Sequence, residues 1–132
     1  MNGGPVNIET AFQKLSEING FEGILFISSK GEVLASRFVE SASVPEGDTI
    51  LAACLKDVDD FARRVGSQGV AELTVRGGLR NLLLIRSGRT GFLTVVVGGE
   101  SMNLALAKLK MKETAEEVER TLDEILKGAG PA

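Results

Sequence analysis

The chain has 132 residues, a formal net charge of −3 at pH 7 and neither histidine, tryptophan nor tyrosine. This length suits a single domain, and the acidic balance argues against a nucleic-acid partner. Without histidine, Ser-His-Asp and Cys-His catalytic groups are excluded, and one cysteine, Cys54, excludes an internal disulfide and the usual closed zinc sites. The N-terminus lacks the pattern of a signal peptide, and no apolar run is as long as a spanning helix. We therefore expect a soluble, cytoplasmic protein without a metal, a cofactor or a transmembrane segment.

The first half of the chain predicts a helix, a hairpin and a second helix. Residues 24–27 form an unbroken apolar run, which is typical of a strand covered on both faces, whereas the returning segment mixes apolar and polar residues as an edge strand does. Lys30-Gly31 can supply the positive φ of the turn between them. The expected elements are a helix from Ile8 to Ile18, strands at 24–27 and 32–39, a loop at 40–48 and a helix at 49–65.

Three strands separated by short glycine-containing turns then predict an antiparallel meander, and a long helix follows it. Thr114 and Glu117 have the spacing of a capping box, while the apolar pattern extends less clearly back towards Asn103. The expected elements are strands at 70–76, 79–86 and 90–97, a helix from near Asn103 to Lys127 and a tail at 128–132.

Burial patterns and connections together predict the arrangement of the sheet. Three continuous apolar runs mark central strands, and the hairpin and meander connections favour the strand order 2-1-5-4-3. The expected fold is α/β of the α+β type, in the order helix, two strands, helix, three strands, helix. One helix should cover one face of the antiparallel sheet and two helices the other, in a single domain over residues 1–132 with its core at about 7–127.

The strand at 70–76 is expected at a border of this sheet, where its outer backbone stays unpaired. Neither proline nor a dense charge cluster blocks it, so a second subunit could pair with this edge. The helix at 49–65 carries a wide apolar arc; one flank can meet the same helix of a second subunit, although a wide core stripe is the alternative. The residues expected at a dimer interface are Leu51, Leu55, Val58, Ala62, Ala71, Leu73 and Val75.

The opposite side of the same helix carries charges of both signs. Such a face can give a partner register as well as affinity, although a merely solvated face is the alternative. An arginine finger from Arg63 or Arg64 has little support, because both lie on a helix rather than on a loop. The residues expected to bind a partner are Lys56, Asp57, Asp59, Asp60, Arg63 and Arg64.

The order of elements resembles that of the roadblock family. The resemblance includes Ile-Asn-Gly-Phe-Glu-Gly at 18–23, Lys-Gly-Glu-Val-Leu-Ala-Ser at 30–36, and nearly the whole chain from Ile8 to Leu126. The family includes roadblock-type dynein light chains and bacterial MglB-type regulators. The resemblance implies a homodimer, or a heterodimer with a paralogue, that extends the sheet through the third strands and presents the second helices to a Ras-like small GTPase. It also implies a protein that is not itself an enzyme: MglB-type members accelerate hydrolysis by their GTPase, as a GTPase-activating protein does, and others act as scaffolds.

Two other functions stay open. The first is an adaptor subunit of a motor or membrane complex that has no effect on nucleotide turnover, and the sequence does not separate it from a regulator. The second is a small-molecule sensing domain, because longin-like and profilin-like sheets can look similar at this level. A ligand pocket is the discriminating feature, and the Val, Leu and Ile residues of the central strands offer no specific polar anchor for a ligand.

Overall fold

The computed structural model describes residues 8–39, 47–66, 71–77, 79–88 and 90–128, with side chains omitted at 47–55 and 122–128. The described elements follow the predicted order. They are α1 (Ile8–Ser16), β1 (Phe21–Ile27), β2 (Val33–Phe38), α2 (Gly47–Arg64), β3 (Glu72–Arg76), β4 (Arg80–Arg86), β5 (Leu93–Gly99) and α3 (Leu104–Gly128).

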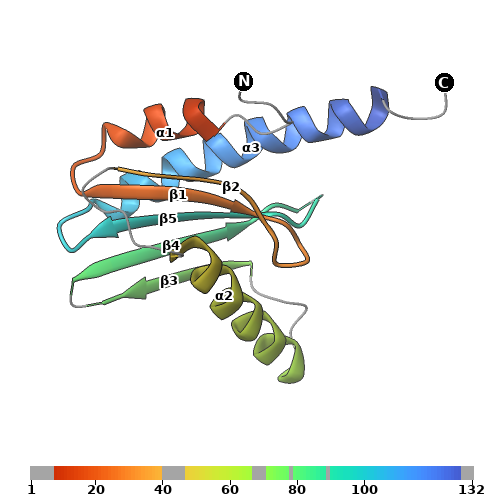
Figure 1. Ribbon diagram of the computed structural model, residues 1–132, viewed down its shortest axis with the longest axis horizontal. Coiled ribbons are helices and arrows are strands. Elements are labelled where there is room, and N and C mark those ends of the chain that lie inside the picture. The colour runs from red at the N-terminus through yellow and green to blue at the C-terminus, as the bar shows by residue number, and fades with distance from the viewer. Residues whose placement is uncertain (1–7, 40–46, 67–70, 78, 89, 129–132) are drawn as a thin grey trace.

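The five strands form one antiparallel sheet in the order β2-β1-β5-β4-β3, which confirms the prediction (Figure 1). At its centre, Leu25 of β1 lies opposite Ser36 of β2 on one side and Val95 of β5 on the other. At one border, β3 pairs with β4 alone among the described strands, from Glu72 opposite Ile85 to Arg76 opposite Asn81. The outer edge of β3 is therefore open, as the sequence predicts.

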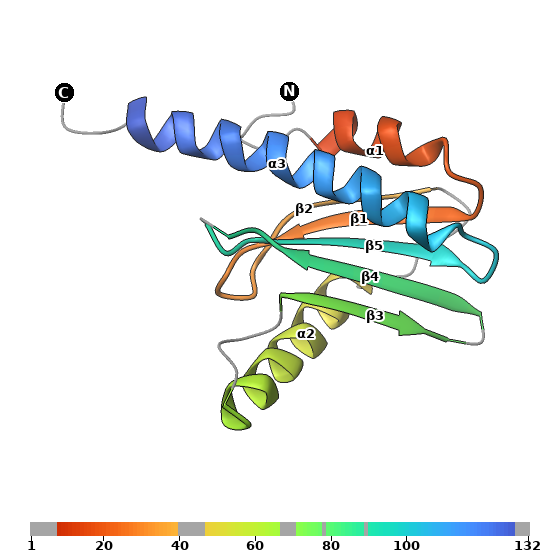
Figure 2. The same cartoon turned by 180° about the vertical axis from the view of Figure 1, so that it is seen from behind.

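The helices cover the two faces of the sheet unequally, also as predicted. Figures 1 and 2 show α1 and α3 together on one face and α2 on the other. Successive residues of a strand point to opposite faces, so Ile24 and Phe26 contribute to the core under α1 and α3, while Leu25 and Ile27 contribute to the core under α2. All four side chains are fully buried. This burial explains why β1 reads as an unbroken apolar run.

The two cores differ in size. The larger one joins α1 and α3 to the sheet, and two edge-to-face ring pairs lie in it, Phe12 with Phe21 and Phe26 with Phe92. The smaller one consists of the buried side chains Leu25, Ile27, Leu84, Leu93 and Val95, with Val33, Phe38, Leu73, Leu82 and Val97 packed against them.

The strand β5 begins at Leu93, three residues later than predicted. Its preceding residues belong to the turn from β4, where Ser87 donates its backbone N–H to the carbonyl of Phe92 and Gly91 donates to the carbonyl of Ser87. Gly91 has a φ of +74°, a conformation in which glycine is favoured. The predicted start of this strand was wrong because Thr90 and Phe92 have good strand propensity. The positive φ of Gly91, which lies between them, turns the chain instead.

The capping box predicted at Thr114 is also wrong. The helix α3 is continuous from Leu104, and Asn103 caps it: its Oδ1 accepts a hydrogen bond of 3.0 Å from the backbone N–H of Leu106. Thr114 lies in the helix interior, 2 % exposed, and its hydroxyl has no hydrogen-bond partner among the described residues. This threonine is buried in the middle of the helix, which a spacing argument cannot detect. The predicted tail beyond Gly128 and residues 40–46 of the predicted loop lie outside the described residues.

The end of α1 and the start of α3 approach each other closely at Gly20. Gly20 follows α1 with a φ of +88°, and a Cβ added there would lie 3.0 Å from the backbone nitrogen of Met102, just before α3. The carbonyl of Gly20 also accepts a 2.7 Å hydrogen bond from the N–H of Gly99. Both the backbone conformation and the close approach therefore favour glycine at this position.

Across the helices that the structure describes, none has the length and apolar character needed to traverse a lipid bilayer.

Candidate functional site

The open edge of β3 and the C-terminal half of α2 both carry exposed side chains. In both views α2 extends past the edge that β3 forms (Figures 1 and 2). Its contacts with the sheet are mainly with β2, at the opposite border. The C-terminal end of α2 therefore runs beyond this border of the sheet.

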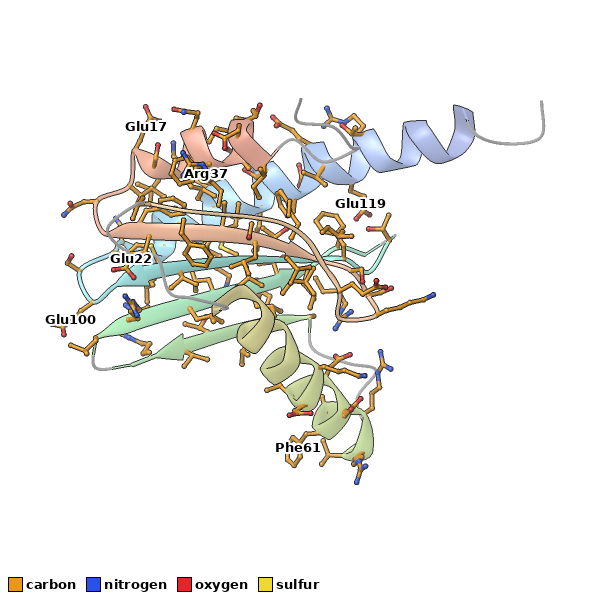
Figure 3. All side chains as sticks on the ribbon, viewed as in Figure 1. Glu17, Glu22, Arg37, Phe61, Glu100 and Glu119 are labelled. Carbon is orange, nitrogen blue, oxygen red and sulfur yellow. The ribbon has the colours of Figure 1, made fainter. Side chains whose placement is uncertain are left out.

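Large apolar side chains on this half of α2 are exposed. Phe61 and Val65 are each 66 % exposed, and Val58 is 37 % exposed. Figure 3 shows Phe61 projecting from α2 away from the sheet. On β3, Val75 is 47 % exposed, on the same face of the sheet as α2. We name Val58, Phe61, Val65 and Val75 the apolar surface of the α2 side.

The structure places the predicted dimer residues in different environments. Val58 and Val75 are exposed and Ala62 is partly buried, whereas Leu73 packs against the smaller core. Ala71 is exposed, and its carbonyl accepts a hydrogen bond from the backbone N–H of Arg86. The side chains of Leu51 and Leu55 lie outside the described residues. Whether these residues meet a second subunit stays a prediction.

Phe61 and Val65 are absent from the set expected at the interface. Their helical spacing places them in the apolar arc of α2, and an apolar arc is normally assigned to the core. Their exposure arises because this half of the helix extends beyond the sheet. The position of the helix relative to the edge strand, which only the tertiary structure provides, therefore identifies them.

The charged residues of α2 are not equivalent. Lys56, Asp57, Asp60 and Arg64 are exposed, and Arg63 is 57 % exposed at its side chain. In contrast, the side chain of Asp59 is only 14 % exposed. Asp59 thus differs from the other charged residues of α2, because its side chain is turned towards Arg86 of β4. Whether this face binds a partner stays a prediction.

Asp59 connects α2 to the end of β4. Its Oδ1 accepts a 2.8 Å hydrogen bond from Nη2 of Arg86, whose side chain is 19 % exposed, and its Oδ2 lies 3.2 Å from Nη2 of Arg63. Arg86 also donates from Nη1 to the carbonyl of Gly91, at 3.1 Å. Since both members of the Asp59–Arg86 pair are largely shielded, this pair contributes more than an exposed ion pair. It holds the C-terminal half of α2 against the turn between β4 and β5.

A small hollow of about 110 Å³ lies between α2 and the turn that joins β1 to β2. The Asp59–Arg86 pair is part of its wall. Its other charged lining residues are Lys30, Lys56, Asp60 and Arg63.

A larger hollow of about 510 Å³ lies on the other face of the sheet, between the end of β4 and α3. Its apolar lining is limited to Ile85 and Ala115, and Ser87, which also lines it, has a hydroxyl oxygen that is buried and unpartnered among the described residues. The charged residues around it are Arg86, Lys112, Glu116, Glu119 and Arg120. The volume would suit a small molecule, whereas the charged lining is unlike that of a typical ligand pocket.

No metal-binding arrangement is present among the described side chains, since no three His, Cys, Asp or Glu residues gather closely enough to hold an ion.

Comparison with known proteins identifies this fold. No protein-family model matches the chain, and no curated protein matches its sequence. Among solved structures, an MglB with a tetrameric arrangement is 26 % identical, with a TM-score of 0.69 over 94 % of each chain. The gliding protein MglB of Thermus thermophilus is also 26 % identical, with a TM-score of 0.68 over 94 % of this chain and 95 % of its own.

A roadblock/LC7 domain from Streptomyces avermitilis has the same fold at 17 % identity, with a TM-score of 0.68 over 83 % of this chain and 92 % of its own. The resemblance to the roadblock family inferred from the sequence is therefore confirmed by structural neighbours that are MglB and roadblock/LC7 proteins.

Proposed function

We propose that this protein is a non-enzymatic, homodimeric partner of a Ras-like small GTPase, which it regulates or scaffolds through the charged face of α2 in the cytoplasm. The observation that carries this proposal is the apolar surface of the α2 side, which includes Val75 on the edge strand β3. The similarity to MglB structures supports a GTPase-regulator function. A heterodimer with a paralogue would present the same surfaces.

The case for a dimer starts from the open edge of β3. An unpaired edge strand is a template for pairing with another strand, and a soluble protein normally blocks or covers it. Here Val75, on this strand, and Phe61 and Val65, on the neighbouring helix, remain exposed. A second copy related by a two-fold axis would pair the two β3 strands and cover these side chains in one contact.

The case for a GTPase partner starts from the charges of α2. Lys56, Asp57, Asp60, Arg63 and Arg64 are exposed on the half of the helix that extends past the sheet. Mixed charges of this kind set the orientation and the association rate of a partner. An adaptor that leaves nucleotide turnover unchanged would use the same face, so the two functions are distinguished by turnover rather than by binding.

A small-molecule sensing domain is the second candidate. The hollow of about 510 Å³ beside α3 is the observation that favours it. Its lining of exposed charged side chains on α3 makes it the weaker candidate, because specific ligand sites are mostly apolar with a few polar anchors.

The dimer is tested by sedimentation of the wild type and of Phe61→Asp. We expect the wild type to sediment as a dimer at micromolar concentration and Phe61→Asp as a monomer, because an aspartate at the centre of the contact would be desolvated without a partner. Leu109→Asp is the matched control, since Leu109 is 56 % exposed on α3, on the other face of the sheet. A wild type that is monomeric throughout would overturn the dimer.

The partner is tested by capture from the native lysate on immobilised protein, with a non-hydrolysable GTP analogue and with GDP in parallel. Enrichment of a Ras-like GTPase with the analogue supports the proposal, and a turnover assay then separates a regulator from a scaffold. If Arg63→Ala and Arg64→Ala both leave turnover unchanged, an arginine finger on α2 is excluded. Absence of any GTPase would overturn the proposed partner.

A further inference from the structure

The small hollow between α2 and the β1–β2 turn has an unusual balance of charge for an acidic protein. Among its described lining residues, four are cationic and two are anionic: Lys30, Lys56, Arg63 and Arg86 against Asp59 and Asp60. The chain as a whole has a net charge of −3. This hollow is thus a local positive site on a negative molecule.

The Asp59 carboxylate in its wall is already engaged. It lies 2.8 Å from Nη2 of Arg86 and 3.2 Å from Nη2 of Arg63, so its charge is balanced within the structure. Asp60 is then the one remaining anionic lining residue that is described. The two arginines exceed the charge of Asp59 by one, and Lys30 and Lys56 exceed the charge of Asp60 by one.

Lys30 and Lys56 differ from the other lysines whose side chains are described. Lys14 pairs with Glu117, Lys110 with Glu17, and both Lys108 and Lys112 with Glu72. No such pair within the described residues involves Lys30 or Lys56. They come from different elements, the β1–β2 turn and α2, and the fold brings them to one hollow: a Cβ added at Gly31 would lie 3.7 Å from Cδ of Lys56.

The size of the hollow restricts what it can hold. About 110 Å³ corresponds to roughly three or four waters, which is enough for a carboxylate group but far below the 300 Å³ or more of typical small-molecule sites. The hollow is also open to the charged face of α2, where Lys56 and Arg63 are exposed. A side chain on a docked protein could therefore reach it.

We propose that this hollow receives a carboxylate side chain from an acidic segment of the partner protein, with Lys30 and Lys56 as the charges that recognise it. The proposal rests on the proposed function, in which the charged face of α2 binds a GTPase, and it assigns to that GTPase an acidic contact segment. The β1–β2 turn thereby becomes part of the interface, although no residue of that turn is in the set that the sequence predicts.

The test is a nuclear magnetic resonance titration with an acidic peptide, acetyl-octaglutamate amide, and with the octaglutamine peptide as its uncharged counterpart. We expect the octaglutamate to shift the backbone amides of Lys30, Gly31 and Lys56, and the octaglutamine not to. The double variant Lys30→Gln/Lys56→Gln should weaken peptide binding about fourfold or more, since each exposed pair contributes about two- to fivefold. Asp60→Asn should strengthen it by up to about fivefold.

The matched control is Lys14→Gln/Lys110→Gln, which makes the same change in net charge at two lysines of the opposite face. We expect this control to bind the peptide within about a factor of two of the wild type. Equal weakening by both double variants, or amide shifts that avoid the hollow, would overturn the proposal.

The same variants separate this proposal from the proposed function. If a Ras-like GTPase binds the wild type and Lys30→Gln/Lys56→Gln equally well, the hollow is not the contact while the GTPase partner stands. If no GTPase binds the wild type, the proposed partner fails, and the peptide titration alone decides whether the hollow takes a carboxylate.

Discussion

The two faces of the sheet carry amphipathic helices that differ in how completely they are buried. On one face, Ala11, Phe12 and Leu15 of α1 are all buried, together with the inward side of α3. On the other face, Phe61 and Val65 of α2 are each 66 % exposed. The difference teaches that an apolar stripe on a helix predicts that the stripe packs against another surface. It does not say whether that surface belongs to the same chain or to a partner.

The forces that hold the helices differ in the same way. The helices α1 and α3 share a continuous apolar core with the sheet, and ion pairs such as Lys14–Glu117 lie at its rim. Among the described side chains of α2, Asp59 connects the helix to the end of β4 through its pair with Arg86. Apolar burial dominates on the first face, and a shielded ion pair is prominent on the second.

The largest expected effect is the difference in the free energy of unfolding between Leu15→Ala and Phe61→Ala. Leu15 is 0 % exposed, so we expect its truncation to lower the free energy of unfolding by about 2–5 kcal/mol. Phe61→Ala, measured by urea denaturation at a dilution where the protein sediments as a monomer, should change it by about 0.5 kcal/mol or less. A comparable loss for both variants would show that Phe61 is buried in the monomer. The two faces of the sheet would then not differ in how completely their helices are buried.

A smaller effect is expected at the junction of α1 and α3. Gly20→Ala forces a side chain into a conformation that costs about 1–2 kcal/mol, and its Cβ would also meet the backbone of Met102. Gly66→Ala, after α2, has the same conformational cost at a φ of +94° but no atom within 4 Å. We therefore expect thermal denaturation to show a larger loss of stability for Gly20→Ala than for Gly66→Ala. Equal losses would show that the contact of the added Cβ with Met102 costs nothing.

The variant Arg86→Gln tests how much the Asp59–Arg86 pair stabilises α2. Removing this guanidinium takes away the 2.8 Å partner of Asp59, while the contact with Arg63 remains, and we expect a loss of about 1 kcal/mol in the free energy of unfolding. Amide hydrogen exchange should accelerate in the C-terminal half of α2 and remain unchanged in α1. Acceleration of similar size in both helices would mean that Arg86 supports the whole domain and not α2 in particular.

The smallest effect is expected for Lys14→Gln. The side chains of Lys14 and Glu117 are 38 % and 48 % exposed, so their pair is strongly screened by solvent. We expect the free energy of unfolding to change by about 0.5 kcal/mol or less, with little dependence on salt, as measured by urea denaturation. A loss as large as that of Arg86→Gln would show that exposed pairs matter as much as the shielded one.

The element order, the sheet order and the open edge of β3 could all be predicted from the sequence. These features depend on local signals: the unbroken apolar run at 24–27, the alternation in 72–76 and the glycines of the turns. The start of β5 and the cap of α3 could not, because Gly91 turns the chain within a strand-like stretch and Thr114 is buried in the middle of α3. Propensity and spacing describe a segment alone, and tertiary contacts override them.

The candidate site was predicted only in part. The sequence by itself placed Val58, Ala62 and the charged residues on α2, because helical periodicity fixes which residues share a face. Only the tertiary structure decided that Phe61 is exposed, that Asp59 turns towards Arg86, and that Lys30 lies beside Lys56. The physical reason is that periodicity determines directions around one helix axis, whereas exposure and long-range pairing depend on where that axis lies against the sheet.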